Sequence, residues 1–119
     1  MGAGRRILLV DDNADMLEPL AELLRAEGHE VQASTDGASA LQMVRRFDAD
    51  VAVIDINLPV MDGHQLATQL RALDRAPRLI ALSGYGRPSD RARSARAGFA
   101  LHLTKPVDLD RLLAAVHSV

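Results

Sequence analysis

The sequence predicts a doubly wound α/β domain, in which one parallel sheet of five strands is covered by helices on both faces. Four short runs, at residues 7–10, 51–54, 79–82 and 99–103, are apolar without alternation, which is typical of strands buried on both faces. Segments with apolar residues at helical spacing lie between these runs, and the connections are only a few residues long. Alternation of strand and helix with short connections indicates right-handed crossovers.

The first strand, residues 7–10, ends at the acidic pair Asp11 and Asp12. The helix after it has leucines at three- to four-residue spacing, namely Leu17, Leu20 and Leu24. Gly28 and Gly98 each follow an alanine-rich helical stretch and precede a strand, the place where a left-handed residue commonly ends a helix. Both glycines are therefore assigned a structural role.

The second strand, residues 29–34, is the weakest of the five, because only Val31 and Ala33 carry the pattern. Helical spacing resumes after it at Ala38, Leu41 and Val44. The third strand, residues 51–54, is followed directly by Asp55. The next helix is indicated by Leu66, Leu70 and Leu73.

The fourth strand, residues 79–82, ends at Ser83, and the fifth, residues 99–103, ends at Thr104 and Lys105. The helix between them has only small apolar residues, Ala92, Ala95 and Ala97. The last helix is indicated by Leu109, Leu112 and Val116. Of the two common orders for such sheets, 2-1-3-4-5 fits five strands, and ligands then bind outside the carboxyl ends of strands 1 and 3.

Composition narrows the function classes. We expect one domain over residues 1–119, with no output domain, and a cytoplasmic location. A net charge of −2 and 3% aromatic residues give no reason to expect direct binding of nucleic acid. No membrane association is expected, because no apolar stretch approaches the roughly 20 residues of a membrane span. Cysteine is absent, which excludes disulfides and thiolate metal sites.

Polar residues at the strand ends predict the functional site. Asp11, Asp12, Asp55, Ser83 and Lys105, the only lysine in the chain, all follow apolar runs, so the predicted sheet gathers them at one edge. Crowded carboxylates need a cation, and Mg²⁺ prefers oxygen ligands. The formal charges of three aspartates, one Mg²⁺ and the lysine sum to zero, which leaves the site able to accept a phosphoryl group.

Asp55 ends the central strand and is the predicted nucleophile, because carboxylates attack phosphorus to give aspartyl phosphates. Asp11 and Asp12 are predicted to hold the metal, directly or through water. Lys105 and Ser83 are predicted to contact the transferred oxygens.

Four segments of the chain resemble the receiver domain of bacterial two-component response regulators. Leu8-Leu-Val-Asp-Asp-Asn13 is similar to the family's acidic pair, Val53-Ile-Asp-Ile-Asn-Leu-Pro-Val-Met-Asp-Gly63 to its phosphoacceptor segment, Leu82-Ser-Gly84 to its switch hydroxyl, and Leu103-Thr-Lys-Pro106 to its lysine. Four such segments in this order and spacing are highly specific. The resemblance implies a flavodoxin-like three-layer (βα)5 sandwich.

The same resemblance implies roles for the site residues. Asp55 is the phosphoacceptor, Asp12 and Asp55 ligate Mg²⁺ or Mn²⁺ with the backbone carbonyl of Asn57, and Asp11 acts through water. The phosphoryl donor is a phosphohistidine on a sensor histidine kinase or a histidine phosphotransfer protein. Such a domain catalyses its own phosphorylation and dephosphorylation without independent enzymatic turnover. It is expected to be a monomer or a weak, phosphorylation-dependent dimer.

The chain departs from the family at His102, three residues before the lysine, where tyrosine or phenylalanine is usual. This histidine and the residues around it, 97–108, resemble receivers of hybrid sensor histidine kinases. Ser83 and His102 are the expected switch residues, acting on the surface formed by the fourth helix, fifth strand and fifth helix. An imidazole at this position raises the hypothesis that the switch responds to protonation near neutral pH.

The fourth helix also carries four arginines, Arg87, Arg91, Arg93 and Arg96. The usual interpretation is a solvated face, and the alternative is a surface that meets an acidic partner. The remaining histidines, His29, His64 and His117, are expected to lie apart and have no metal-site spacing.

Two other function classes compete with the receiver interpretation. A haloacid-dehalogenase-like phosphatase also uses an aspartyl phosphate, Mg²⁺, a hydroxyl and a lysine. It places its nucleophile after strand 1 in an Asp-x-Asp motif and normally needs a cap domain, and this chain shows neither. A flavodoxin-like binding module has the same sheet, but no phosphate cradle rich in Gly, Ser and Thr follows strand 1.

Overall fold

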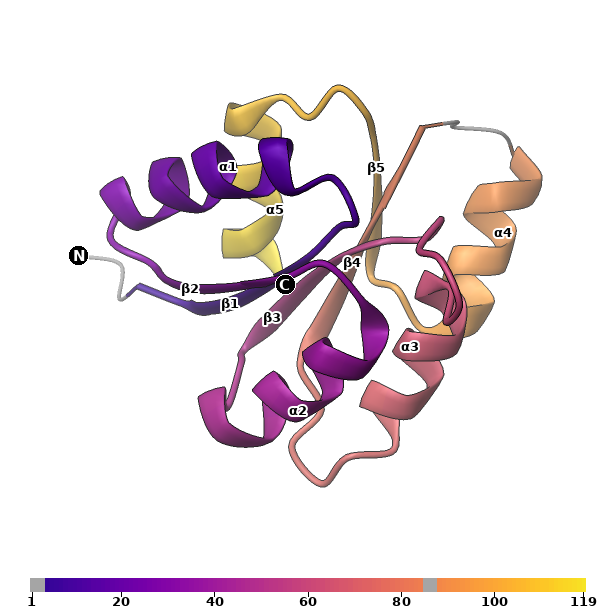
Figure 1. The fold of residues 1–119 in the computed structure, drawn as a ribbon. Helices are drawn as coiled ribbons and strands as arrows, with labels where there is room; N and C mark the ends of the chain where they lie inside the picture. Colours follow the sequence, from indigo (N-terminus) through magenta and orange to yellow (C-terminus); the bar gives the residue numbers. More distant parts are fainter. Residues whose placement is uncertain (1–3, 85–87) are drawn as a thin grey trace.

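Strands and helices alternate along the chain (Figure 1). The structure, a computed structural model, describes residues 4–84 and 88–119. The elements are β1 Arg6–Val10, α1 Ala14–Ala26, β2 Glu30–Ser34, α2 Gly37–Phe47, β3 Val51–Asp55, α3 Gly63–Arg71, β4 Arg78–Ser83, α4 Pro88–Ala97, β5 Leu101–Thr104 and α5 Leu109–Ser118. All strand pairs are parallel in the order β2-β1-β3-β4-β5, which confirms the predicted order.

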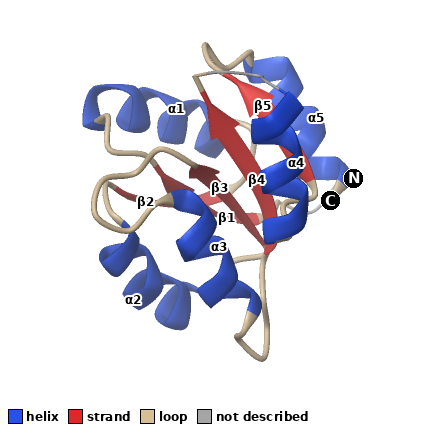
Figure 2. Ribbon diagram, turned by 90° about the vertical axis from the view of Figure 1, so that its right-hand side faces the viewer, coloured by secondary structure: helices blue, strands red, loops and turns tan. Residues whose placement is uncertain are grey.

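The strands send alternate side chains to opposite faces of the sheet and so build two separate cores. On one face, Ile54 of β3 packs with Leu66 of α3 and with residues of α2. On the other face, Val53 packs with Leu112 of α5 and with residues of α1. Helices therefore cover both faces (Figures 1 and 2). No helix within the described residues is both long and apolar enough to cross a membrane.

The fifth strand differs from the sequence-based prediction. It covers Leu101–Thr104 instead of 99–103 and pairs only with β4, so it is an edge of the sheet. Leu101 is 37% exposed, so the expectation that this strand is buried on both faces is wrong. The strand pairs with β4 on one side, and its other side is the edge of the sheet. Phe99 precedes the strand and contributes to the core instead. Gly28 and Gly98 have φ values of 95° and 101°, which confirms left-handed ends of α1 and α4.

His29 is buried just before β2, which begins at Glu30, one residue later than predicted. Its Nδ1 accepts a hydrogen bond from the Arg5 backbone N–H at 2.9 Å. Its ring centroid lies 5.3 Å from that of His117, so the expectation that these two histidines lie apart is wrong. Burial lowers the pKa of His29, the neighbouring His117 lowers it further, and Glu27 opposes them with a smaller effect.

The unfolding free energy is expected to decrease as the pH falls below about 6.5, the pKa of histidine in an unfolded chain. Because the pKa of His29 is lower in the folded state, the unfolded chain binds the additional proton. The stability contributed by neutral His29 is full above that pH and is lost as the pH falls through the folded-state pKa. Urea unfolding at a series of pH values measures this dependence.

His29→Gln should flatten the decrease in stability, because it removes the titrating ring. His117→Gln is the matched control: it removes the neighbouring ring and its charge but keeps the buried His29 imidazole, so it should flatten the curve less. Identical pH dependence in the wild type and in His29→Gln would contradict this assignment.

Candidate functional site

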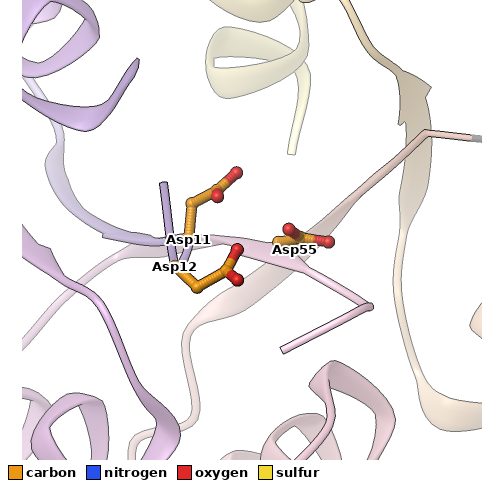
Figure 3. A group of neighbouring side chains, drawn as sticks. All are labelled: Asp11, Asp12 and Asp55. Atoms are coloured by element: carbon orange, nitrogen blue, oxygen red, sulfur yellow. The ribbon is translucent and has the colours of Figure 1, made fainter. Parts of the chain in front are cut away.

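Three aspartates meet at the carboxyl ends of β1 and β3 (Figure 3). These strands are neighbours, with Val10 opposite Ile54, so the residues that follow them come side by side. One carboxylate oxygen from each of Asp11, Asp12 and Asp55 lies within 4.8 Å of the others. Asp11 and Asp55 are buried and Asp12 is exposed, so the cluster opens to solvent on the Asp12 side.

The two buried carboxylates are held in the same way. Asp11 Oδ1 accepts a hydrogen bond from the Asn13 backbone N–H at 2.9 Å, and Asp55 Oδ1 accepts one from the Asn57 backbone N–H at 2.8 Å. Asn13 is itself the N-cap of α1, so helix capping does not account for Asp11 or Asp12. In each buried aspartate the second oxygen, Oδ2, remains for other contacts.

Lys105 contacts both of these oxygens from the loop after β5. Its Nζ donates a hydrogen bond to Asp55 Oδ2 at 2.9 Å and lies 2.6 Å from Asp11 Oδ2. The gathering of Lys105, Asp11 and Asp55 at one edge of the sheet is thus confirmed. Its backbone N–H donates to the carbonyl oxygen of Ser83 at 2.7 Å, which fixes the loop against β4. Burial lowers the pKa of Lys105, but Asp11 and Asp55 together outweigh it and raise the pKa above its usual value.

The aspartate cluster fits a hard divalent cation. Its ligand atoms are oxygens, the type that Mg²⁺ prefers. The Lys105 ammonium pairs with Asp11 Oδ2 and with Asp55 Oδ2, so it neutralises only part of the charge of the cluster. Three carboxylates at −3 and one ammonium at +1 leave a formal charge of −2, which a divalent ion would neutralise.

Gly63 allows α3 to begin directly against the site. Its backbone N–H donates to the Ile56 carbonyl oxygen at 3.2 Å, and Asp62 and Gln65 form a capping box around it. A Cβ atom at position 63 would lie 2.5 Å from the Asp55 carbonyl oxygen and 2.5 Å from Ile56 Cα. Both are backbone atoms, so the connection that carries Asp55 has no room for a side chain here.

Gly63→Ala is therefore expected to lower the unfolding free energy by about 1–3 kcal/mol, the usual cost of overpacking. Urea unfolding followed by circular dichroism measures this loss. The control is Gly84→Ala, because a Cβ atom at that position would meet no atom of the described residues within 4 Å. Equal losses in the two variants would show that helix and loop propensity, and not the close approach to Asp55, set the cost.

Ser83 and His102 lie in direct contact beside the aspartates. Ser83 ends β4 and is buried, and its Oγ lies 2.7 Å from His102 Nε2. His102 Nδ1 lies 3.1 Å from the Oγ of Ser94, a buried residue of α4 that the sequence did not single out. A serine in an arginine-rich helix shows no pattern that separates it from a solvated residue, so only the three-dimensional structure reveals this contact.

The arginines of α4 that the structure describes lie on the solvent side of the helix. Arg91, Arg93 and Arg96 are exposed, and Arg87 lies outside the described residues. Arg91 and Arg111 of α5 line a shallow hollow of about 150 Å³ along β5. This exposure agrees with a solvated face and with a partner surface alike.

The sequence matches a family model described as the response regulator receiver domain over residues 7–117. The transcriptional regulatory protein PrrA of Mycobacterium tuberculosis is 40% identical over 114 residues, which are 96% of this chain and 49% of PrrA. The sensory transduction protein RegX3 of the same species is 34% identical over 113 residues, 95% of this chain and 49% of RegX3. The chain spans about half the length of the curated relatives it matches.

Solved structures show the same fold. The chemotaxis protein CheY4 of Vibrio cholerae superimposes with a TM-score of 0.93 at 26% identity, covering 98% of this chain and 99% of CheY4. A receiver domain protein of Methanospirillum hungatei has a TM-score of 0.89 at 28% identity, with coverage of 98% and 93%. A response regulator of Burkholderia pseudomallei, solved with a phosphorylated aspartic acid, a calcium ion and citrate, has a TM-score of 0.86 at 25% identity, with coverage of 93% and 65%.

Proposed function

This chain belongs to the response regulator receiver domain family of two-component signalling, and from that premise we propose that Asp55 takes up a phosphoryl group in a Mg²⁺-dependent reaction. The observation that carries the proposal is the contact of Lys105 with Asp55 inside a cluster of three aspartates. The similar Burkholderia protein with its phosphorylated aspartic acid supports this chemistry. The family match over residues 7–117 supports the proposal that residues 1–119 act as one receiver domain.

In the proposed reaction, a carboxylate oxygen of Asp55 attacks the phosphorus atom of a phosphohistidine on a sensor histidine kinase or a phosphotransfer protein. A P–O bond forms on Asp55, the P–N bond breaks, and the departing imidazole takes up a proton. Lys105 and Ser83 contact the transferred oxygens and balance their charge. Attack of water on the phosphorus atom later releases phosphate and restores the carboxylate.

Asp11, Asp12 and Asp55, together with the backbone carbonyl of Asn57, are the groups that would hold Mg²⁺ or Mn²⁺. A bound ion neutralises negative charge on the carboxylates and on the phosphoryl oxygens. The three carboxylate oxygens within 4.8 Å of one another, with one ammonium for three negative charges, support this assignment.

The proposed output is a change of the surface formed by α4, β5 and α5, with Ser83 and His102 as the switch residues. The exposed Arg91, Arg93 and Arg96 suit an acidic partner, whose binding would then weaken with added salt.

Direct binding of nucleic acid is not expected of this domain, and this stays a prediction because PrrA, about twice as long, is named a transcriptional regulator. A cytoplasmic location, sensitivity of the switch to pH and a monomeric or weakly dimeric state also stay predictions.

Labelling by the small phosphodonor acetyl phosphate tests the proposed function. Mass spectrometry of the intact protein should show one added phosphoryl group with Mg²⁺ present and none after EDTA removes divalent ions. The label should be lost in hydroxylamine, as expected for an acyl phosphate. Steady hydrolysis of a phosphate ester, without a labelled chain, would support the phosphatase alternative. The match to the receiver domain family argues against that alternative.

A further inference from the structure

Over residues 91–97, the part of helix α4 whose side chains the structure describes, the one buried side chain is polar. Between residues 91 and 97, only Ser94 is buried, at 1% exposed, and the apolar residues of this stretch are alanines that are exposed or half-buried. A helix that buries so little apolar surface is weakly held, so individual polar contacts have a large share in its placement. The contacts of Ser94 therefore bear directly on where α4 lies beside β5 (Figure 2).

Ser94 belongs to a chain of hydrogen-bonding groups that reaches the functional site. Ser83 Oγ lies 2.7 Å from His102 Nε2, His102 Nδ1 lies 3.1 Å from Ser94 Oγ, and His64 Nε2 of α3 lies 3.5 Å from the same oxygen. Each ring nitrogen of His102 thus has a serine partner, one at the end of β4 and one on α4. In a neutral imidazole one nitrogen donates and the other accepts, so the roles of the two serines are linked.

We propose that His102 is a positioning residue that transmits the hydrogen-bonding state of Ser83 to Ser94, and through it to α4. The inference rests on the proposed function, in which Ser83 contacts the phosphoryl group. In the resting protein, Nδ1–H donates to Ser94 Oγ, and the Ser94 hydroxyl donates its own hydrogen to His64 Nε2 of α3, 3.5 Å away. Nε2 then accepts the hydrogen of the Ser83 hydroxyl.

Phosphorylation exchanges the donor and acceptor roles along the chain from Ser83 through His102 to Ser94. A serine hydroxyl has a single hydrogen, and Ser83 donates it to a phosphoryl oxygen, so Nε2 loses its donor. The contact with Ser83 then persists only with a proton on Nε2. The ring gives up the proton on Nδ1 and gains one on Nε2, so its charge is unchanged. Nδ1 becomes an acceptor, and Ser94 must turn its hydroxyl from His64 of α3 toward the His102 ring, which changes how α4 is held.

Imidazole ¹⁵N NMR of the wild-type protein tests, without any substitution, which ring nitrogen of His102 carries the proton. The signal of His102 is identified by its absence in His102→Gln. In the resting protein, Nδ1 should be protonated and Nε2 unprotonated, and Mg²⁺ with beryllofluoride, a phosphoryl mimic, should exchange the two states. A resting ring with the proton on Nε2, an unchanged tautomer after beryllofluoride binds, or a ring protonated on both nitrogens would overturn the inference.

Ser94→Ala tests the link to α4. Beryllofluoride should still bind, as followed by ¹⁹F NMR, but the resulting change in α4 amide shifts should be less than half of that in the wild type. Ala95→Ser, which adds a hydroxyl on the exposed side of the same helix, is the matched control and should respond as the wild type does. A full α4 response in Ser94→Ala would overturn the link. Failure of the wild type to bind beryllofluoride would overturn the proposed function and this inference with it.

Discussion

Asp55→Asn is expected to abolish labelling of the protein by acetyl phosphate. An amide does not attack phosphorus as a carboxylate does, while asparagine keeps the volume of the side chain and an oxygen that accepts the Asn57 N–H bond. The loss should therefore come from the missing nucleophile and not from a collapsed site. Mass spectrometry of the intact chain, with circular dichroism to confirm folding, measures the outcome.

The matched control for this loss is Asp62→Asn. Asp62 is a nearby aspartate whose role is to cap α3, and asparagine caps helices as well as aspartate does. This variant should be labelled as fast as the wild type. Undiminished labelling of Asp55→Asn would show that another residue is the acceptor, and peptide mapping would then identify it.

Lys105→Met is expected to slow labelling of Asp55 by on the order of 100-fold, because it removes a charged donor from the transferred oxygens. Without divalent ions the variant should also be less stable than the wild type by about 1–3 kcal/mol, since Asp11 and Asp55 lose their shared cation. Added MgCl₂ should return more stability to the variant than it adds to the wild type. Quench-flow labelling and urea unfolding with and without MgCl₂ measure the two effects.

Lys105→Arg separates charge from geometry. The guanidinium keeps the positive charge and should recover most of the stability, but its planar fork does not reproduce a compact ammonium beside two carboxylates. Labelling should therefore stay slow. A Lys105→Met variant that is labelled at the wild-type rate would remove the lysine from the proposed chemistry.

The sheet and the aspartate cluster could be predicted from the sequence because the apolar runs mark the strands and the polar residues after them mark the strand ends. Parallel strands bring their carboxyl ends to one edge, so polar residues that directly follow apolar runs must gather there. Asp55 and Lys105 are fifty positions apart and are nevertheless in contact at 2.9 Å. The register of neighbouring strands, with Asp55 opposite Leu82 and Ser83 opposite Thr104, gives this result its physical basis.

Contacts away from this edge of the sheet could not be predicted from the sequence. His29 and His117 lie in a connection and a final helix turn, and no periodic pattern specifies which such segments meet. The burial of Ser94 depends on how α4 docks beside an edge strand, and the docking uses hydrogen bonds instead of an apolar stripe. The exposure of Leu101 was missed because apolarity along a strand does not reveal whether the strand has one neighbour or two.

The single lysine of the chain also gives the site a chemical handle. Apart from the α-amino group, its side chain is the only primary amine in the sequence, and it contacts both buried aspartates. Reductive methylation with ¹³C-formaldehyde preserves the positive charge and would place two ¹³C methyl groups on one nitrogen inside the cluster. Ion binding and phosphoryl transfer would each then be read from one resolved NMR signal, in a protein whose sequence is unchanged.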